Sequence, residues 1–493
     1  MVEILSGIRI KIQNLILIII LSLIIINSYY SIQIEIEECT AGVFGPESNT
    51  LNLPIIWKNR DLSGRSKQVQ VLIIGHGKYD FIGITTKYSS GIAFGINAAG
   101  LAAGNTYIEV KGEGGPIGNL KLNRLILENT KTIDEAYNYI KSLSGKAYGS
   151  SIVIGDVDKV GVIDICKDIA LNLNTTIKGW IIRTNHWRNI LPQNFSKYEA
   201  GLPGSSSKAR YQSATEYVRK IISNRKLKLI DIFMLSKSHI NKISNLSICR
   251  HGSSISTVSA GIIVIFSIKP ELSVMWTSLG QPCTSIFTPI IVAISKLNIS
   301  SIEYWSNGNV WRNNELIRNQ IYGSNKLYEK DKETTDKIFN LISNVEESFI
   351  NYIELLWKIA IGIENKNPTD ITNNLISKID EIRISITNQL IKKNYIELAL
   401  AINIALKYSY IILKYDLKAI SHTTQKKIFI DAAKIFKNQM IKIDNDLNNI
   451  ENGKLLEEPV KQTVMSNQLI IISSIIVVAV ASLSFFIIYK RRK

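Results

Sequence analysis

The sequence predicts an α+β region followed by an all-α region, and one sequence pattern in each region supports this prediction. Between residues 39 and 300, short runs of β-branched and apolar residues alternate with helical stretches, which is typical of α+β domains. Beyond about residue 325, glycine nearly disappears and apolar residues recur at helical spacing. Each end of the chain also carries an apolar segment. We expect the N-terminal segment to direct export and the C-terminal segment to anchor the protein in a membrane.

Composition allows a large folded protein and disfavours a nucleic-acid partner. The chain has 493 residues, of which 46% are hydrophobic, enough to fill a sizeable core. Its formal net charge is +17, but the Lys and Arg residues are dispersed rather than clustered on one expected element. Binding to a phosphate backbone needs a concentrated basic surface, so we expect no nucleic-acid partner.

The first expected element is a targeting segment. Arg9 and Lys11 precede an apolar run at 15–26, whose length suits a signal peptide better than a bilayer span. We therefore predict that residues 1–38 form a signal and propeptide segment and that the chain beyond them is exported.

Residues 39–300 are expected to form the catalytic domain. Alternating apolar patterns predict short strands, and the turn-rich segment 155–159 predicts a hairpin between two of them. The predicted strands are 69–74, 92–96, 151–154 and 161–165, and the predicted helices are 132–143 and 209–222.

Residues 325–452 are expected to form an all-α helical bundle close to a membrane. Residues 453–467 then serve as a linker, and residues 468–489 form an uncharged stretch long enough to be a transmembrane helix. The basic tail at 490–493 predicts a cytoplasmic C-terminus, because positive residues favour the inner side of a membrane. The expected location is the cell membrane, with the catalytic domain outside.

Two neighbouring segments carry the residues of chemical interest. ECTAGVFG at 38–45 places Cys39 near the start of an expected strand, and LPIIWKNRD at 53–61 ends the next one with a charged cluster. In a two-stranded hairpin these ends meet, so Cys39 and Asp61 are expected to lie close together.

This arrangement resembles the cysteine N-terminal-nucleophile (Ntn) hydrolases, within the group of the isopenicillin N acyltransferases and the choloylglycine hydrolases. The resemblance spans about 39–300 and implies a four-layer αββα sandwich. It implies that Cys39 is the nucleophile and that Asp61 holds its freed α-amine. Lys58 stands where the family has Arg, so either Lys58 or Arg60 takes the supporting role.

Five further motifs extend the resemblance. GINAAGLAAGNT at 95–106 resembles the segment that ends in the oxyanion-hole residue, here Asn105. TNHW at 184–187 implies that Asn185 positions the amine or the substrate. SSSKAR at 205–210 implies that Arg210 orients the carboxylate and supports the thiolate. CRHG at 249–252 and GQPC at 280–283 resemble the end of the acyltransferase branch.

The chemistry explains this choice of residues. A thiol needs deprotonation to attack, and an N-terminal cysteine supplies an amine whose ordinary pKa near 8 suits a base at neutral pH. Attack on an amide builds an oxyanion, which a donor such as Asn105 would stabilise. His186 and His251 are alternative bases in a Cys-His pair, but His186 follows Asn185 directly and would point to the opposite face of a strand.

The expected reaction is hydrolysis of a linear, non-peptide C–N amide bond in a small N-acyl amide, through a thioester formed after self-cleavage before Cys39. Acyl transfer from the same thioester is the alternative, and an inactive surface-binding or receptor protein of the same fold is the second. No organic cofactor is expected, and the four cysteines lack the paired spacing of a zinc site, so no metal is expected. Cys249 with Cys283 is the one pair to test for a disulfide. The oligomeric state is left open.

Overall fold

The computed structural model describes residues 37–292 and single helical positions between 311 and 357. The gaps in the first range are residues 64–65, 74–75, 109–115, 144–148, 167–168, 188–204, 240–244 and 253.

The first of two sheets carries the start of the catalytic region at its centre. It has six strands in the order β10-β1-β2-β11-β12-β13, and all neighbouring pairs are antiparallel. Its strands are β1 (Glu37–Phe44), β2 (Ile55–Ser63), β10 (Trp180–Arg183), β11 (Ile255–Val264), β12 (Val274–Leu279) and β13 (Thr288–Ile291). Every described position of β11 and β12 is buried, as expected of strands covered on both faces.

The second sheet is an antiparallel meander in which each strand pairs with the next along the chain. The seven strands are β3 (Gln68–Ile73), β4 (Phe81–Thr86), β5 (Phe94–Asn97), β6 (Ala102–Tyr107), β7 (Ser150–Gly155), β8 (Val160–Cys166) and β9 (Ile169–Thr176). The predicted hairpin around 155–159 is confirmed, because β7 pairs with β8 in continuous register.

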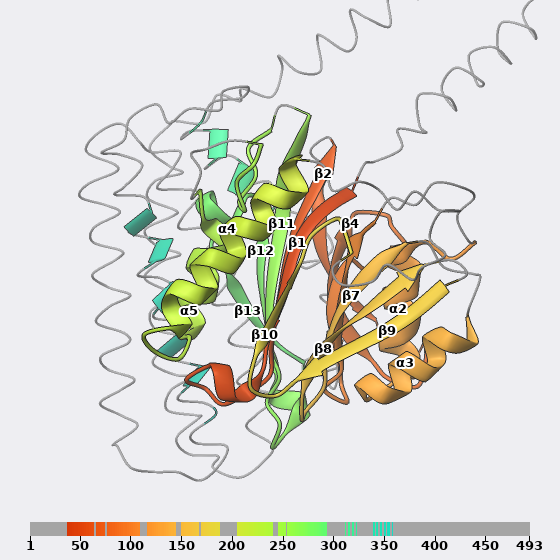
Figure 1. The fold of residues 1–493 in the computed structure, drawn as a ribbon. Coiled ribbons are helices and arrows are strands. Elements are labelled where there is room, and N and C mark those ends of the chain that lie inside the picture. Colours follow the sequence, from red (N-terminus) through yellow and green to blue (C-terminus); the bar gives the residue numbers. More distant parts are fainter. Residues whose placement is uncertain are drawn as a thin grey trace, which may run out of the picture. The chain divides into compact units, whose positions relative to one another are not determined.

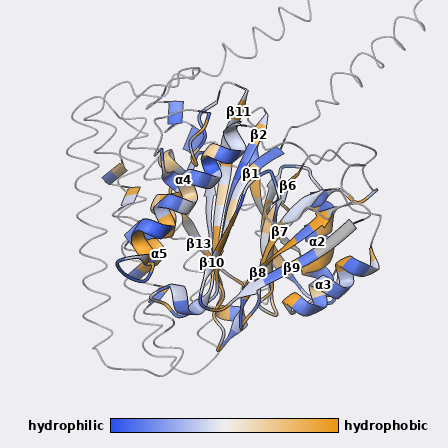
Figure 2. Cartoon of the chain, viewed as in Figure 1, coloured by the Kyte–Doolittle hydropathy of each residue, from blue (hydrophilic) through white to orange (hydrophobic). Residues whose placement is uncertain are grey.

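The two sheets pack face to face, and helices cover their outer faces (Figure 1). Helices α2 (Asn119–Asn129) and α3 (Ile133–Ser142) lie on the second sheet, and α4 (Ser205–Ile222) and α5 (Leu229–Lys237) on the first. The predicted four-layer αββα sandwich is therefore observed. Figure 2 shows hydrophobic and hydrophilic residues on different sides of α3, as a helix on a sheet requires.

Among the described residues, one apolar cluster fills the space between the two sheets and another fills the space between the second sheet and its helices. One joins residues of both sheets, such as Val43 and Ile263 of the first with Ile84 and Val162 of the second. The other lies between the second sheet and its helices and includes Leu122. Burial of these side chains is the main force holding the layers together.

Described residues of the region 311–357 pack on the first sheet's side of the sandwich. The Trp357 ring stacks on Phe266 at 5.4 Å, and its Nε1 donates to the carbonyl of Leu272. The Glu346 carboxylate pairs with Lys237 of α5 and accepts from the backbone N–H of Phe287. Every described position from 339 to 357 is helical, the state predicted from its apolar spacing.

Several expectations fall on other parts of the chain. The targeting segment up to residue 36, most of the expected bundle, the linker, the segment 468–489 and the tail lie outside the described residues. Within the described residues, no helix combines the length and the apolar character needed to cross a bilayer.

Candidate active site

Strand register divides the charged residues around Cys39 between two faces of the first sheet. In the β1–β2 pair Cys39 lies opposite Arg60, and Glu38 lies opposite Asp61. Because side chains alternate along a strand, Cys39 shares the inter-sheet face with Glu37, while Glu38 points toward α4. The predicted meeting of the two strand ends is thus observed, and the site has a sulfur side and a helix side.

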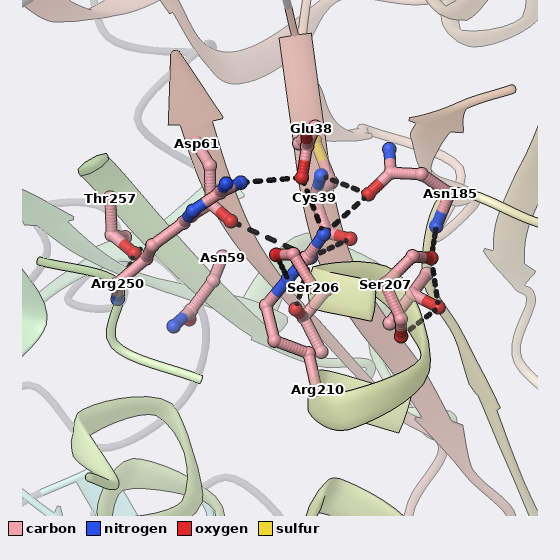
Figure 3. Close-up of polar contacts among 12 residues, drawn as sticks. Glu38, Cys39, Asn59, Asp61, Asn185, Ser206, Ser207, Arg210, Arg250 and Thr257 are labelled. Carbon is pink, nitrogen blue, oxygen red and sulfur yellow. Dashed lines mark hydrogen bonds and ion pairs between the residues drawn. The ribbon is translucent and has the colours of Figure 1, made fainter. Parts of the chain in front are cut away.

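Asn185 and Arg210 hold the backbone of Cys39 (Figure 3). The Cys39 N–H donates to Asn185 Oδ1 at 3.0 Å, and Arg210 Nη1 donates to the Cys39 carbonyl at 2.7 Å. Arg210 also donates to Asn185 Oδ1 at 2.9 Å and to Thr40 Oγ1 at 2.9 Å. The guanidinium is fully buried, so these contacts fix the position of the Cys39 nitrogen.

Asn185 is itself held by neighbouring elements. Its backbone N–H donates to Ser207 Oγ near the start of α4, and its Nδ2 donates to the carbonyl of Tyr107 at the end of β6. The Asn185 oxygen therefore has to face Cys39 and Arg210, because its nitrogen is already engaged. This second contact links the two sheets at the site.

Asp61 is a buried carboxylate with spare capacity to accept. Its Oδ1 accepts from Thr257 Oγ1 at 2.7 Å, and its Oδ2 lies 3.5 Å from Arg210 Nη1 but has no hydrogen-bond partner among the described residues. Burial raises the pKa of Asp61 from 3.8 to about 6, an effect that Arg210 and Arg250 only partly offset. A cationic group arriving near Oδ2 would stabilise the ionised form.

Glu38, directly before Cys39, lies between two arginines. Its Oε2 accepts from Arg210 Nη2 at 2.8 Å and forms an ion pair with Arg250 Nη1 (Figure 3). Arg250 is buried and comes from the segment before β11, within the CRHG motif. Neither the role of Glu38 nor that of Arg250 follows from local sequence, although the motif itself marks the segment.

A second charged group lies on the sulfur side. Glu37 Oε1 is 3.6 Å from Cys39 Sγ, 3.4 Å from Lys58 Nζ and 3.2 Å from Arg60 Nε. Although burial opposes ionisation, Arg60 and Lys58 hold the pKa of Glu37 below its ordinary value. Both candidates for the supporting cation thus lie on the face of the Cys39 side chain.

The Cys39 thiol is protonated in this environment. Its side chain is completely buried, and burial raises its pKa to about 12, further than Lys58 lowers it. Among the described residues, no histidine makes a hydrogen bond with this thiol: His186 Nδ1 contacts Ser207 and Thr184, and His251 belongs to another cluster. Deprotonation of Cys39 therefore needs a different base.

Asn105 presents a free amide donor within the sandwich. Its Oδ1 accepts from Asn123 Nδ2 at 2.8 Å and from Lys58 Nζ at 3.1 Å, which fixes the orientation of the amide. Its Nδ2 is buried and has no partner among the described residues. Buried donors are rarely left unpaired, so Asn105 has the property required of an oxyanion donor.

Asn59 differs in role from the other residues of its motif. Its Nδ2 donates to the carbonyls of Ser236 and Ile248, and its Oδ1 accepts from Trp57 Nε1 and Ser236 Oγ. All its polar capacity is therefore spent on attaching α5 and the segment before β11 to β2. Asn59 is structural, whereas its neighbours Lys58, Arg60 and Asp61 face the site.

The arrangement is that of an uncleaved chain whose polar groups converge on the bond before Cys39. Lys58, Arg60, Asp61, Asn185 and Arg210 are brought together around Cys39, and Asn105 is joined to them through Lys58. Their catalytic roles stay predictions. The groups that sequence reasoning missed are Glu37, Glu38, Asn123, Arg250 and Thr257.

Comparison with known proteins places these residues in a family context. Residues 47–283, a little under half of the chain, match the model of the acyl-coenzyme A:6-aminopenicillanic acid acyl-transferase family. The match confirms the resemblance inferred from the motifs, and Cys39 lies just before the matched segment. No curated protein sequence matches the chain.

Solved structures show similarity at low sequence identity. A variant of conjugated bile acid hydrolase from Clostridium perfringens is 16% identical, with a TM-score of 0.36, and the alignment covers 53% of this chain and 94% of that one. The N-acylethanolamine-hydrolyzing acid amidase ortholog of Caenorhabditis elegans is 17% identical, with a TM-score of 0.34, over 46% of this chain and 92% of that one.

Proposed function

We propose, from the family match of residues 47–283, that this protein is an Ntn-type enzyme that hydrolyses linear N-acyl amides with Cys39 as nucleophile. One observation carries the proposal: the backbone nitrogen of Cys39 donates to Asn185 Oδ1, and Arg210 holds both that oxygen and the Cys39 carbonyl, so the nitrogen has a fixed place in the site. A cysteine hydrolase with a histidine base has no use for such a network. An enzyme whose base is the freed α-amine requires it.

The first step of the proposal is self-cleavage between Glu38 and Cys39. The thiol proton passes to the Glu37 carboxylate, the acceptor at 3.6 Å, and the sulfur attacks the Glu38 carbonyl carbon. The C–N bond then breaks, the nitrogen of Cys39 receives the proton, and a thioester joins Glu38 to the sulfur. Water hydrolyses this thioester, which releases the α-carboxylate of Glu38 and restores the Cys39 thiol.

The second step is turnover by the freed amine. The new α-amine inherits the contact with Asn185 Oδ1, and Asp61 Oδ2 on the neighbouring strand accepts no hydrogen bond from the described residues. The amine accepts the thiol proton, and the sulfur attacks the substrate carbonyl carbon while Asn105 Nδ2 stabilises the oxyanion. The amide C–N bond then breaks, the leaving amine takes the proton from the α-amine, and an acyl thioester remains on Cys39. Water then opens the acyl thioester. An amine acceptor in place of water would give acyl transfer, the alternative reaction.

Cleavage before Cys39 would remove the negative charge of Glu37 from the site, which favours a substrate that carries an anionic group. Glu37 neutralises Lys58 and Arg60 in the uncleaved chain, and both cations are buried. Departure of Glu37 leaves them without that counter-charge on the sulfur side, and a carboxylate near the scissile amide would restore it. We infer that anionic N-acyl amides are preferred over neutral ones.

Mass spectrometry of the acyl-enzyme tests the reaction. Detergent-purified full-length protein is mixed with paired N-acyl amides, one with a carboxylate on the amine portion and one with the matching methyl ester, and quenched in acid. The acyl mass should appear on the fragment that begins with Cys39, and more strongly for the carboxylate. Added hydroxylamine should intercept it as the hydroxamate.

A matched set of variants separates the claims. Cys39→Ala should give no acyl adduct and no turnover, while Cys166→Ala should keep both. Arg60→Gln should reduce the preference for the carboxylate substrate and leave turnover of the ester. Normal turnover by Cys39→Ala would overturn the nucleophile. An intact Glu38–Cys39 bond in a folded, inactive protein would favour the binding or receptor alternative.

Membrane anchoring is also part of the proposal and rests on sequence alone. The uncharged segment 468–489 followed by the basic tail supports a single span with the catalytic domain outside. Protease added to intact cells should remove epitopes inserted near residue 300 and spare an epitope fused after Lys493. Digestion of the tail with survival of the catalytic domain would reverse this orientation.

A further inference from the structure

A cluster of two cysteines and two histidines lies on the helix side of the first sheet, apart from the Cys39 thiol. It consists of His239, Cys249, His251 and Cys283, and their candidate ligand atoms all lie within 4.8 Å of one another. His239 follows α5, Cys249 and His251 precede β11, and Cys283 lies in a short 3-10 helix after β12 (Pro282–Thr284). We propose that this cluster is a structural zinc site.

The three distances that meet at His251 Nε2 are close to those around one tetrahedral ion. With typical zinc–nitrogen and zinc–sulfur bonds, the tetrahedral edges are roughly 3.3 Å between two nitrogens and roughly 3.5 Å between nitrogen and sulfur. His239 Nε2 lies 3.0 Å from His251 Nε2, and the sulfurs of Cys249 and Cys283 lie 3.7 and 3.3 Å from the same His251 nitrogen. The observed separations bracket the expected edges.

Hydrogen bonding among the four side chains is a poor alternative. Three polar atoms approach His251 Nε2, yet one ring nitrogen offers either one hydrogen or one lone pair. At most one of those contacts can then be a good hydrogen bond. A cation at the centre of the four atoms satisfies them all at once.

Burial and charge favour the same conclusion. Cys249, His251 and Cys283 are buried, and His239 is half-buried. Two thiolates in such a place would be strongly destabilising alone, but a divalent ion makes the group neutral. Two sulfur and two nitrogen ligands are the donor set that zinc accepts in closed, non-catalytic sites.

Groups outside the four ligands also suit a metal site. Tyr322 Oη lies 3.6 Å from Cys283 Sγ, within reach of a thiolate, and its ring packs on His251 at 4.6 Å. A cavity of about 270 Å³ reaches His239 and Cys283 and offers an entry route. This site could not be predicted from the sequence, because its ligands are not in paired CxxC spacing and come together only through the fold.

The site would position an active-site arginine. Arg250 stands between the ligands Cys249 and His251 and forms the ion pair with Glu38. The backbone here is tied further, since the Arg250 carbonyl accepts from Gln281 Nε2, next to the segment of Cys283. Metal binding would therefore hold Arg250 in place. The proposed zinc ion positions this arginine and takes no part in the reaction.

Metal analysis of the purified full-length protein tests the proposal. Plasma mass spectrometry should find about one zinc per chain in the wild type and less than about a tenth in Cys249→Ser and His251→Ala, since loss of a ligand opens the site. Cys39→Ala and Cys166→Ser are matched cysteine controls and should keep the metal. A wild-type protein without zinc, or with a Cys249–Cys283 disulfide in its peptide map, would overturn the proposal.

Cobalt replacement keeps the test valid if the ligand variants fail to fold. Wild-type protein stripped by chelator and reloaded with cobalt(II) should show the intense visible bands of a tetrahedral ion and a thiolate charge-transfer band. Weak octahedral spectra would contradict a site with two sulfur ligands. Chelation should also lower the melting temperature of Cys39→Ala, and zinc alone should restore it.

Discussion

At the scale of single residues, Asp61 has an environment that chemistry at Cys39 can exploit. The carboxylate is completely buried, and one of its oxygens has no hydrogen-bond partner among the described residues. In the uncleaved chain this is unfavourable for the ionised form, because Arg210 at 3.5 Å compensates burial only in part. Cleavage would create an α-amine nearby, and when that amine is protonated its charge would stabilise the ionised carboxylate.

The pH dependence of precursor stability follows from this environment. The folded chain raises the pKa of Asp61 from 3.8 to about 6, so its stabilising effect is full below pH 3.8 and is lost as pH rises through 6. Cys39→Ala should therefore lose stability between these values relative to Cys39→Ala/Asp61→Asn, by roughly 3 kcal/mol for a shift of about two units. Parallel melting curves of the two variants against pH would contradict the assignment.

Asn105 is the residue proposed to donate to the oxyanion. Lys58 and Asn123 both donate to its oxygen, which fixes the direction of its nitrogen, a donor with no partner among the described residues. Asn105→Ala should lower the rate of acylation by about 10²- to 10³-fold, the usual effect of removing one oxyanion donor, and leave the pH profile unchanged. A pre-steady-state assay of thioester formation measures this directly. Acylation at the wild-type rate would mean that another group stabilises the oxyanion.

At the scale of elements, local pattern predicts hairpins well and long-range pairing poorly. The β7–β8 hairpin and the β1–β2 pair join neighbouring segments, so alternation and turn residues were enough to predict them. The β1–β10 pair joins Ala41 to Arg183, far along the chain, and nothing local specifies that partner. Asn185 follows β10, so its place in the site came from the family motif alone.

Glu37 and Glu38 illustrate the same limit. Their acidity is visible in the sequence, but their partners Lys58, Arg60, Arg210 and Arg250 come from three separate elements. Only the strand alternation of β1, once the register is known, assigns one glutamate to each face. Arg250 lies in a motif that was recognised, yet only the fold shows that it contacts the residue before Cys39.

The contact between the sheets depends on a ring packed against glycines. Phe94 of β5 lies between Gly104 of β6 and Gly261 of β11, where an added Cβ would come within 2.4 and 2.5 Å of the ring. Gly261→Ala should therefore destabilise the protein by about 1–3 kcal/mol, the usual effect of overpacking a core. Gly118→Ala is the matched control, because nothing lies within 4 Å of its added Cβ. Equal melting temperatures for both variants would contradict this packing.

At the scale of the whole molecule, the sandwich places strand β1 between two sets of charged groups, one on each face of the first sheet. Its inter-sheet face brings Cys39 toward Lys58, and its other face brings Glu38 toward α4 and Arg250. Family resemblance predicted the four layers, whereas the pattern of short strand-like runs and helical stretches predicted only the α+β class. The regions at both ends that frame this domain stay predictions from hydropathy and charge.

Intact mass measurement combined with N-terminal sequencing of the purified protein shows whether Cys39 is released as an N-terminal residue. Wild-type protein should contain a chain that begins Cys39-Thr40-Ala41, and Cys39→Ala should retain Glu38 joined to residue 39. The processed fraction should track amidase activity as the two develop together. A wild-type enzyme that is fully active with an intact Glu38–Cys39 bond would contradict the account, because its general base would then not exist.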